Sequence, residues 1–216
     1  MGNAVEFEQL RSGEGETFRQ LFAIYASSIT PREQKPEDWI RVMVASPEYR
    51  VWVAGADGLV VGFSFLFLPQ AERFALLEYM AVAPQHRGRG LGAELFRRSV
   101  AHAATPEGAG LPVLLEIDSD REASSDRSLR TRRERFYRRL GCVKITGLRY
   151  LMPLRGVGPV PEMDLMVYQA QPRMGIARSH LRRWLQTIYR DVYRCSPDDP
   201  RIEQMLLPLP DPVSVE

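Results

Sequence analysis

Apolar residues near the start of the chain recur at helical spacing. Phe18, Leu21 and Tyr25 lie three and four residues apart, which predicts an amphipathic helix over residues 14–27. A second helix is predicted after Pro36, because acidic residues follow this proline and apolar residues then repeat at similar spacing. The chain is therefore expected to begin with two helices.

Strand patterns come next. Residues 50–68 are rich in β-branched and aromatic residues, and Asp57-Gly58 interrupts them with a dipeptide typical of a hairpin turn. Residues 73–82 are almost continuously apolar, which predicts a strand buried on both faces that leads into a glycine run. We expect two antiparallel strands followed by one buried strand.

The second half of the chain alternates strands with helices. A basic helix is predicted over residues 127–141 and is expected to end at Gly141. A last helix is predicted over residues 177–194, with Leu181, Leu185, Ile188 and Val192 on one face. Further strands are predicted over residues 112–118, 142–152 and 162–170. This order predicts an α/β fold in which helices flank a mixed central sheet.

Length and composition narrow the organisation of the chain. With 216 residues, of which 44% are hydrophobic, the chain can bury one sizeable core but is short for two full domains. The composition changes after Pro172, so we expect a main domain over residues 1–171 and a C-terminal helical extension over residues 172–216. The apolar stripe of the last helix is expected to cover the sheet or a partner subunit, which leaves a homodimer open.

Charge and cysteine content exclude several classes of protein. The formal net charge of +2 gives no whole-chain argument for binding nucleic acid or membrane. No apolar run approaches the roughly 20 residues of a membrane span. Cys142 and Cys195 lie far apart without metal-ligand spacing, which disfavours a zinc site and favours a reducing compartment. We therefore expect a cytoplasmic protein.

The segment QHRGRGLG, residues 85–92, combines glycines and arginines at the predicted start of a helix. The first N–H groups of a helix lack partners within the helix, and its dipole attracts anions to that end. Glycines let a phosphate approach the backbone, and Arg87 or Arg89 can add charge-assisted hydrogen bonds. The segment therefore predicts a pyrophosphate site, with a glycine-rich turn that binds no ligand as the alternative.

The same residues resemble a known family. VAPQHRGRGLG is similar to the acetyl-CoA signature of GCN5-related N-acetyltransferases (GNAT), Gln/Arg-x-x-Gly-x-Gly/Ala, with Gln85, Gly88 and Gly90 at the signature positions. RFYRRLGCVKI resembles the family's later FYxxLGF segment, although Cys142 stands where phenylalanine is usual. The segment between the fifth strand and this motif is longer than in the common form. The order of elements from about residue 5 to residue 171 also fits a GNAT fold.

The resemblance implies a binding mode for acetyl-CoA, used as a co-substrate without a metal. Met80 and Val82 of the fourth strand would pair with the pantetheine arm. The pyrophosphate would be held by the backbone of the glycine-rich segment, which comprises Arg87, Gly88, Arg89, Gly90, Leu91 and Gly92.

Acetyl transfer to an amine needs a base for the amine and a donor for the departing thiolate. Tyr137 matches the family's tyrosine and is expected to be the donor, with simple packing between helix and sheet as the alternative. Glu116 and Glu78 are the candidate bases, because both are carboxylates within apolar strands. Glu78 is expected on the same side as Met80 and Val82. Pairing with arginines, or a water relay, would remove either glutamate from this role.

Seven arginines crowd the basic helix: Arg127, Arg130, Arg132, Arg133, Arg135, Arg138 and Arg139. A solvated face with acidic neighbours is the simplest interpretation; contact with the coenzyme's 3′-phosphate or an acidic acceptor is the alternative. No aromatic stacking pattern accompanies them, which disfavours nucleic acid. The sequence as a whole predicts an acetyl-CoA-dependent N-acetyltransferase acting on a primary amine, with a non-catalytic acyl-CoA-binding module as the alternative. It does not identify the amine.

Overall fold

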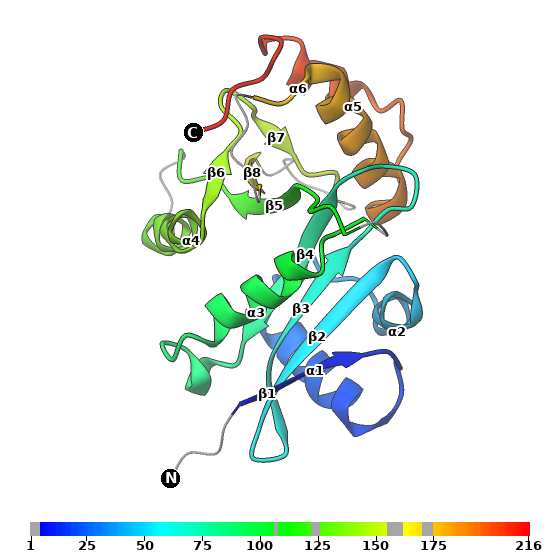
Figure 1. Cartoon of the computed structure of the whole chain (residues 1–216), viewed down its shortest axis with the longest axis vertical. Coiled ribbons are helices and arrows are strands. Elements are labelled where there is room, and N and C mark those ends of the chain that lie inside the picture. Colours follow the sequence, from blue (N-terminus) through cyan, green and yellow to red (C-terminus); the bar gives the residue numbers. More distant parts are fainter. Residues whose placement is uncertain (1–4, 106–107, 122–125, 155–161, 170–174) are drawn as a thin grey trace. The chain divides into compact units, whose positions relative to one another are not determined.

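The computed structural model describes residues 5–105, 108–121, 126–154, 162–169 and 175–216 (Figure 1). The chain divides into two compact units. The first comprises residues 1–70 and 75–109, and the second residues 71–74 and 110–216. The predicted boundary between residues 171 and 172 lies outside the described residues and stays a prediction.

The first unit contains four antiparallel strands in chain order: β1 (Glu6–Leu10), β2 (Tyr49–Ala56), β3 (Leu59–Phe67) and β4 (Ala75–Val82). The predicted hairpin is confirmed, since Asp57 and Gly58 join β2 to β3 with φ angles of 53° and 76°. Two positive φ angles are typical of the type I′ turn, whose twist matches that of the strands. β1 was not predicted.

Three helices and a short 3₁₀ turn complete this unit: α1 (Gly15–Ser28), α2 (Glu37–Ala45), η1 (Pro84–His86) and α3 (Leu91–Ala101). The two predicted N-terminal helices are confirmed. The Tyr25 ring of α1 packs on Phe63 of β3, with ring centroids 6.3 Å apart. Ser64 follows Phe63 on β3, and its hydroxyl forms a hydrogen bond of 2.8 Å with Ser99 of α3. Because adjacent strand residues point to opposite faces, α1 and α3 cover opposite faces of the sheet.

The second unit is built around one central strand. β8 (Glu162–Tyr168) pairs antiparallel with three others: β5 (Val113–Asp118), β6 (Cys142–Lys144) and β7 (Tyr150–Leu151). Its helical elements are α4 (Arg127–Arg139), α5 (Arg178–Thr187), the π-helical turn η2 (Ile188–Val192) and α6 (Pro200–Leu206). Gly141 follows α4 with a φ angle of 92°, so the predicted end of the basic helix is confirmed.

The two faces of this second sheet carry different helices. Register places Glu116 opposite Leu165 and Ile117 opposite Asp164, so Glu116 and Asp164 point to opposite faces. Asp164 meets Lys144, which also contacts Glu134 of α4. Glu116 instead contacts the segment that follows α5 and η2. Figure 1 shows α4 and α5 on opposite sides of this sheet.

The apolar stripe of the last helix is buried within the chain itself. Leu181, Leu185 and Ile188 have no exposed surface, and Val192 is 2% exposed. Burial of this stripe therefore does not require a partner subunit. Among the described residues, no helix is both long and apolar enough to span a membrane.

Candidate active site

The turn between β4 and α3 has the backbone geometry that the glycine pattern predicts. Gly88 and Gly90 have φ angles of 77° and 81°, in the left-handed region that favours glycine. Apart from the glycine's own chain neighbours, a Cβ atom at either position would meet no atom of the described residues within 4 Å. Gly90 is also the N-cap of α3, so open backbone stands beside the unpaired N–H groups of a helix N-terminus.

The side chains of this turn have different tasks. Arg87 Nε donates to the carbonyl oxygen of Val82 at 2.9 Å, so this arginine closes the turn on itself. Arg89 is exposed and makes no hydrogen bond or ion pair with any described residue. Gln85 is exposed within η1, whereas Leu91 is buried and offers a ligand only its backbone. Arg89 is therefore the arginine best placed to meet an anion.

Met80 and Val82 lie on the α3 face of the first sheet. Both are partly buried and pack against a cluster that includes Leu91 and Leu95 of α3. Their expected role as partners of the pantetheine arm is one of the main chain, which these side-chain contacts leave untested.

The expected orientation of Glu78 is wrong. The pairing of β3 with β4 passes from Phe65↔Tyr79 to Leu66↔Leu77, which leaves Glu78 as the extra residue of a β-bulge. A bulge interrupts the alternation of side chains, so Glu78 is not on the side of Met80. It points toward the other face, where Tyr79 packs on Tyr25 of α1.

At this position Glu78 is engaged by two partners. Tyr49 Oη donates to Oε2 at 2.6 Å, and Lys35 Nζ donates to Oε1. The Glu78 side chain is only 2% exposed, and that of Lys35 is 11% exposed. A buried carboxylate paired with an ammonium is shielded from a substrate. The alternative expected for Glu78 was pairing with an arginine, but the structure pairs it with Lys35 instead.

Glu116 is held by two tyrosine hydroxyls. Tyr150 Oη of β7 donates to Oε1, and Tyr193 Oη donates to Oε2 at 2.5 Å. The carboxylate is half-buried. Neither tyrosine was predicted, and no local pattern could identify Tyr193, which lies 77 residues further along the chain.

Tyr137 lies on the sheet-facing side of α4 and is 9% exposed. Burial raises its pKa to about 12, although the nearby Arg133 opposes this shift. The phenol is therefore protonated at neutral pH and can donate. Its ring also packs edge-to-face on Phe136, so packing and proton donation are compatible.

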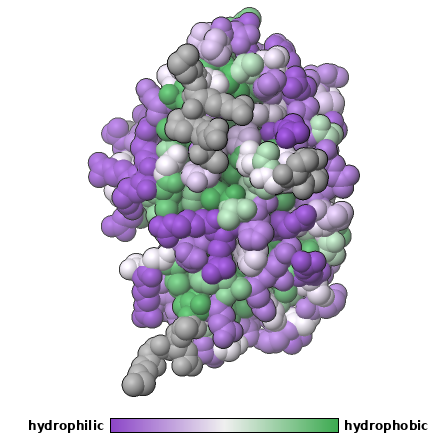
Figure 2. Space-filling view, viewed as in Figure 1, coloured by the Kyte–Doolittle hydropathy of each residue, from purple (hydrophilic) through white to green (hydrophobic). Residues whose placement is uncertain are grey.

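Several arginines of α4 have acidic neighbours, as the simplest interpretation predicted. Arg130 pairs with Asp126 at 3.1 Å, and Arg138 pairs with Glu134 at 2.7 Å. The other five arginines of α4 are exposed, and Figure 2 shows a mainly hydrophilic surface over α4. These five are Arg127, Arg132, Arg133, Arg135 and Arg139, of which Arg133 also pairs with Asp118 at 2.5 Å.

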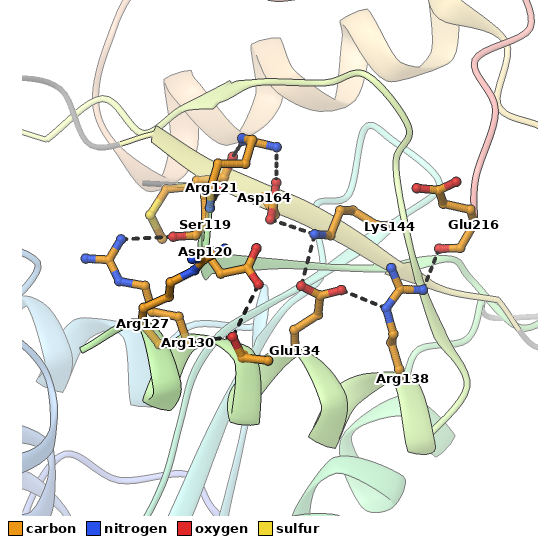
Figure 3. Close-up of polar contacts among 12 residues, drawn as sticks. Ser119, Asp120, Arg121, Arg127, Arg130, Glu134, Arg138, Lys144, Asp164 and Glu216 are labelled. Carbon is orange, nitrogen blue, oxygen red and sulfur yellow. Dashed lines mark hydrogen bonds and ion pairs between the residues drawn. The ribbon is translucent and has the colours of Figure 1, made fainter. Parts of the chain in front are cut away.

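A charged network joins α4 to the sheet beneath it (Figure 3). Lys144 Nζ lies 3.0 Å from Glu134 and 2.8 Å from the fully buried Asp164, which Arg121 also contacts at 2.6 Å. Burial lowers the pKa of Lys144, but its bonds to both carboxylates outweigh this effect and raise the pKa overall. Burial likewise raises the pKa of Glu134, but its two cationic partners lower it overall. The network fixes α4 on the sheet.

Comparison with known proteins identifies the family. Residues 47–143 match the model of the acetyltransferase (GNAT) domain. Among curated proteins, none matches the sequence. Residues 47–143 therefore match a GNAT acetyltransferase domain, which confirms the predicted resemblance to this family.

Solved structures share the fold of this chain. A protein from Bacteroides thetaiotaomicron described as a GNAT acetyltransferase has a TM-score of 0.68 at 19% identity, covering 87% of this chain and 98% of its own. A spermidine N-acetyltransferase chimera from Vibrio cholerae and hSSAT has a TM-score of 0.54 at 16% identity, with 76% and 94% covered. A GNAT acetyltransferase from Elizabethkingia anophelis with acetyl-CoA bound has a TM-score of 0.50 at 15% identity, with 76% and 97% covered. The predicted α/β GNAT fold, a mixed sheet flanked by helices, is confirmed.

Proposed function

We propose that this protein is an N-acetyltransferase that passes the acetyl group of acetyl-CoA directly to a primary amine in a ternary complex. The observation that carries the proposal is the turn between β4 and α3. Gly88 and Gly90 leave its backbone open at a helix N-terminus, and Arg89 adds a positive charge without a described partner. The acetyl-CoA bound to the relative from Elizabethkingia anophelis supports the same ligand.

Direct transfer requires two proton movements. The amine loses a proton and its nitrogen forms a bond to the thioester carbon, after which the carbon–sulfur bond breaks. The sulfur leaves as a thiolate and takes up a proton to give the free thiol. We assign proton acceptance to Glu116, directly or through a water, and donation to the sulfur to Tyr137.

Two properties of the second unit support these assignments. A phenol whose pKa is raised to about 12 keeps its proton at neutral pH and can give it to a developing thiolate. Glu116 is half-buried, and two tyrosine hydroxyls orient its carboxylate. Glu78 is the weaker candidate base because Lys35 already neutralises it within the protein.

The acceptor belongs to the class of primary amines. The spermidine N-acetyltransferase among the structural relatives acts on an amine, which supports this class without identifying the compound. A polyamine is therefore one sensible member of a first substrate panel.

Release of free thiol tests the proposal. Purified protein is incubated with acetyl-CoA and a panel of polyamines, amino acids, aminoglycosides and peptides, and thiol release is followed after subtraction of the protein's own cysteines. We expect release that depends on one class of amine. Tight acetyl-CoA binding without release on any amine would instead favour a non-catalytic acyl-CoA-binding module.

A further inference from the structure

The carboxylate of Glu116 is held by residues from two elements. Tyr150 comes from β7 within the sheet, but Tyr193 follows η2 in the C-terminal segment. Each tyrosine bonds a different carboxylate oxygen, so the orientation of the carboxylate is fixed at both ends. We propose that Tyr193 is a positioning residue that orients Glu116 toward the amine; this inference rests on the proposed function.

The backbone around Tyr193 is built to present this side chain. Its N–H bonds to the carbonyl of Ile188 at 3.2 Å, a bond that spans five residues and makes η2 a π-helical turn. Tyr193 is the C-cap of this turn, so the helix ends there. Ile188, Tyr189 and Val192 are buried, which holds the turn in place. The rare turn therefore directs the Tyr193 hydroxyl to Glu116.

The hydrogen bond between Tyr193 and Glu116 suits a positioning role for Tyr193. A carboxylate has about four lone-pair sites. The hydroxyls of Tyr150 and Tyr193 each use one of them. Burial, and secondarily the charge of Glu116, raise the pKa of Tyr150 well above its ordinary value, so this phenol stays a donor. An acceptor whose orientation is fixed before the amine arrives loses less freedom when the amine binds.

Tyr193→Phe tests the inference, with Tyr189→Phe as a matched control. Both variants remove one phenolic hydroxyl from the same segment, but Tyr189 donates to the backbone carbonyl of Leu151. We expect Tyr193→Phe to lower kcat/KM for the amine by about tenfold to a hundredfold, the value of a hydrogen bond to a charged group. KM for acetyl-CoA should stay unchanged. Tyr189→Phe should lower Tm without this loss of activity.

A double-mutant cycle separates positioning from general destabilisation. In a Glu116→Gln background, Tyr193→Phe should cause little further loss of kcat, and its effect on Tm should shrink, because the charged acceptor is already gone. Equal kinetic losses in Tyr193→Phe and Tyr189→Phe, or additive effects with Glu116→Gln, would overturn the inference. Absence of amine-dependent turnover in the wild-type protein would refute the proposed function, while the cycle on Tm still tests the contact.

Discussion

Replacement of Gly90 by alanine separates two effects of the glycine turn. The first effect is on stability, because a φ angle of 81° forces the alanine into a left-handed conformation. This costs about 1–2 kcal/mol. Within the part of the chain that the structure describes, no further steric cost arises, since the added Cβ has no neighbour within 4 Å. We therefore expect a fall in Tm of about 2–4 °C for each kcal/mol lost.

The second effect is on acetyl-CoA. Because the protein leaves the space beside Gly90 empty, the added methyl group can only displace solvent or ligand. Loss of one hydrogen bond to a phosphate would cost about 1.5–3 kcal/mol. Calorimetric titration should therefore show acetyl-CoA binding that is weaker by about tenfold to a hundredfold.

Gly58→Ala provides the matched control. Gly58 has a φ angle of 76° and equally open surroundings, but it lies in the hairpin turn between β2 and β3. The two variants should lose similar stability, and only Gly90→Ala should lose affinity. Unchanged affinity in folded Gly90→Ala would refute the phosphate-binding role of the turn. Equal losses of affinity in both variants would attribute the effect to destabilisation.

Three other predictions concern buried titratable groups. Tyr137→Phe should reduce turnover at least about tenfold while leaving acetyl-CoA affinity unchanged. Tyr137 should also make wild-type stability depend on pH, because its pKa is about 12 in the folded protein against the ordinary 10.0. Denaturant unfolding should show the free energy of unfolding of the wild type falling by up to about 2.7 kcal/mol between pH 10 and 12. Tyr137→Phe should remove this fall. Glu78→Gln should cost about 3–5 kcal/mol of stability in urea, because it removes the charge that Lys35 pairs with; a loss under about 1 kcal/mol would contradict this ion pair. A thiol reagent should modify Cys195 in the folded protein and Cys142 only on unfolding, because burial raises the pKa of Cys142 to about 12; simultaneous modification would contradict this.

The elements that sequence predicts well are those with a local signature. The helix around Phe18 has its own apolar periodicity, and the Asp57-Gly58 turn has its own backbone preference. β1 lacks such a signature, since three of its five residues are polar and its only partner among the strands of the first unit is β2. The predicted strand over residues 142–152 is two short strands, because Gly147 turns between them with a φ angle of 75°.

The residues of the candidate site also divide into those with a local sequence signature and those that depend on distant parts of the chain. The glycine turn is local, so its backbone geometry follows from residues 85–92 themselves. The orientation of Glu78 depends on a bulge, which strand alternation cannot predict because it is defined by pairing with β3. The Tyr193 contact depends on a π-turn and on a distant strand.

The separation of Tyr137 from Glu116 has a chemical consequence under the proposed mechanism. In direct transfer the amine nitrogen and the departing sulfur are bonded to the same carbon, so the base and the proton donor must both reach that centre. Here α4 holds Tyr137 on one side of the second sheet, and Glu116 points to the other. Glu116 takes its hydrogen bonds from Tyr150 and Tyr193 instead. With the base and the donor on opposite faces, the proposed mechanism therefore requires at least one of the two protons to pass through a water.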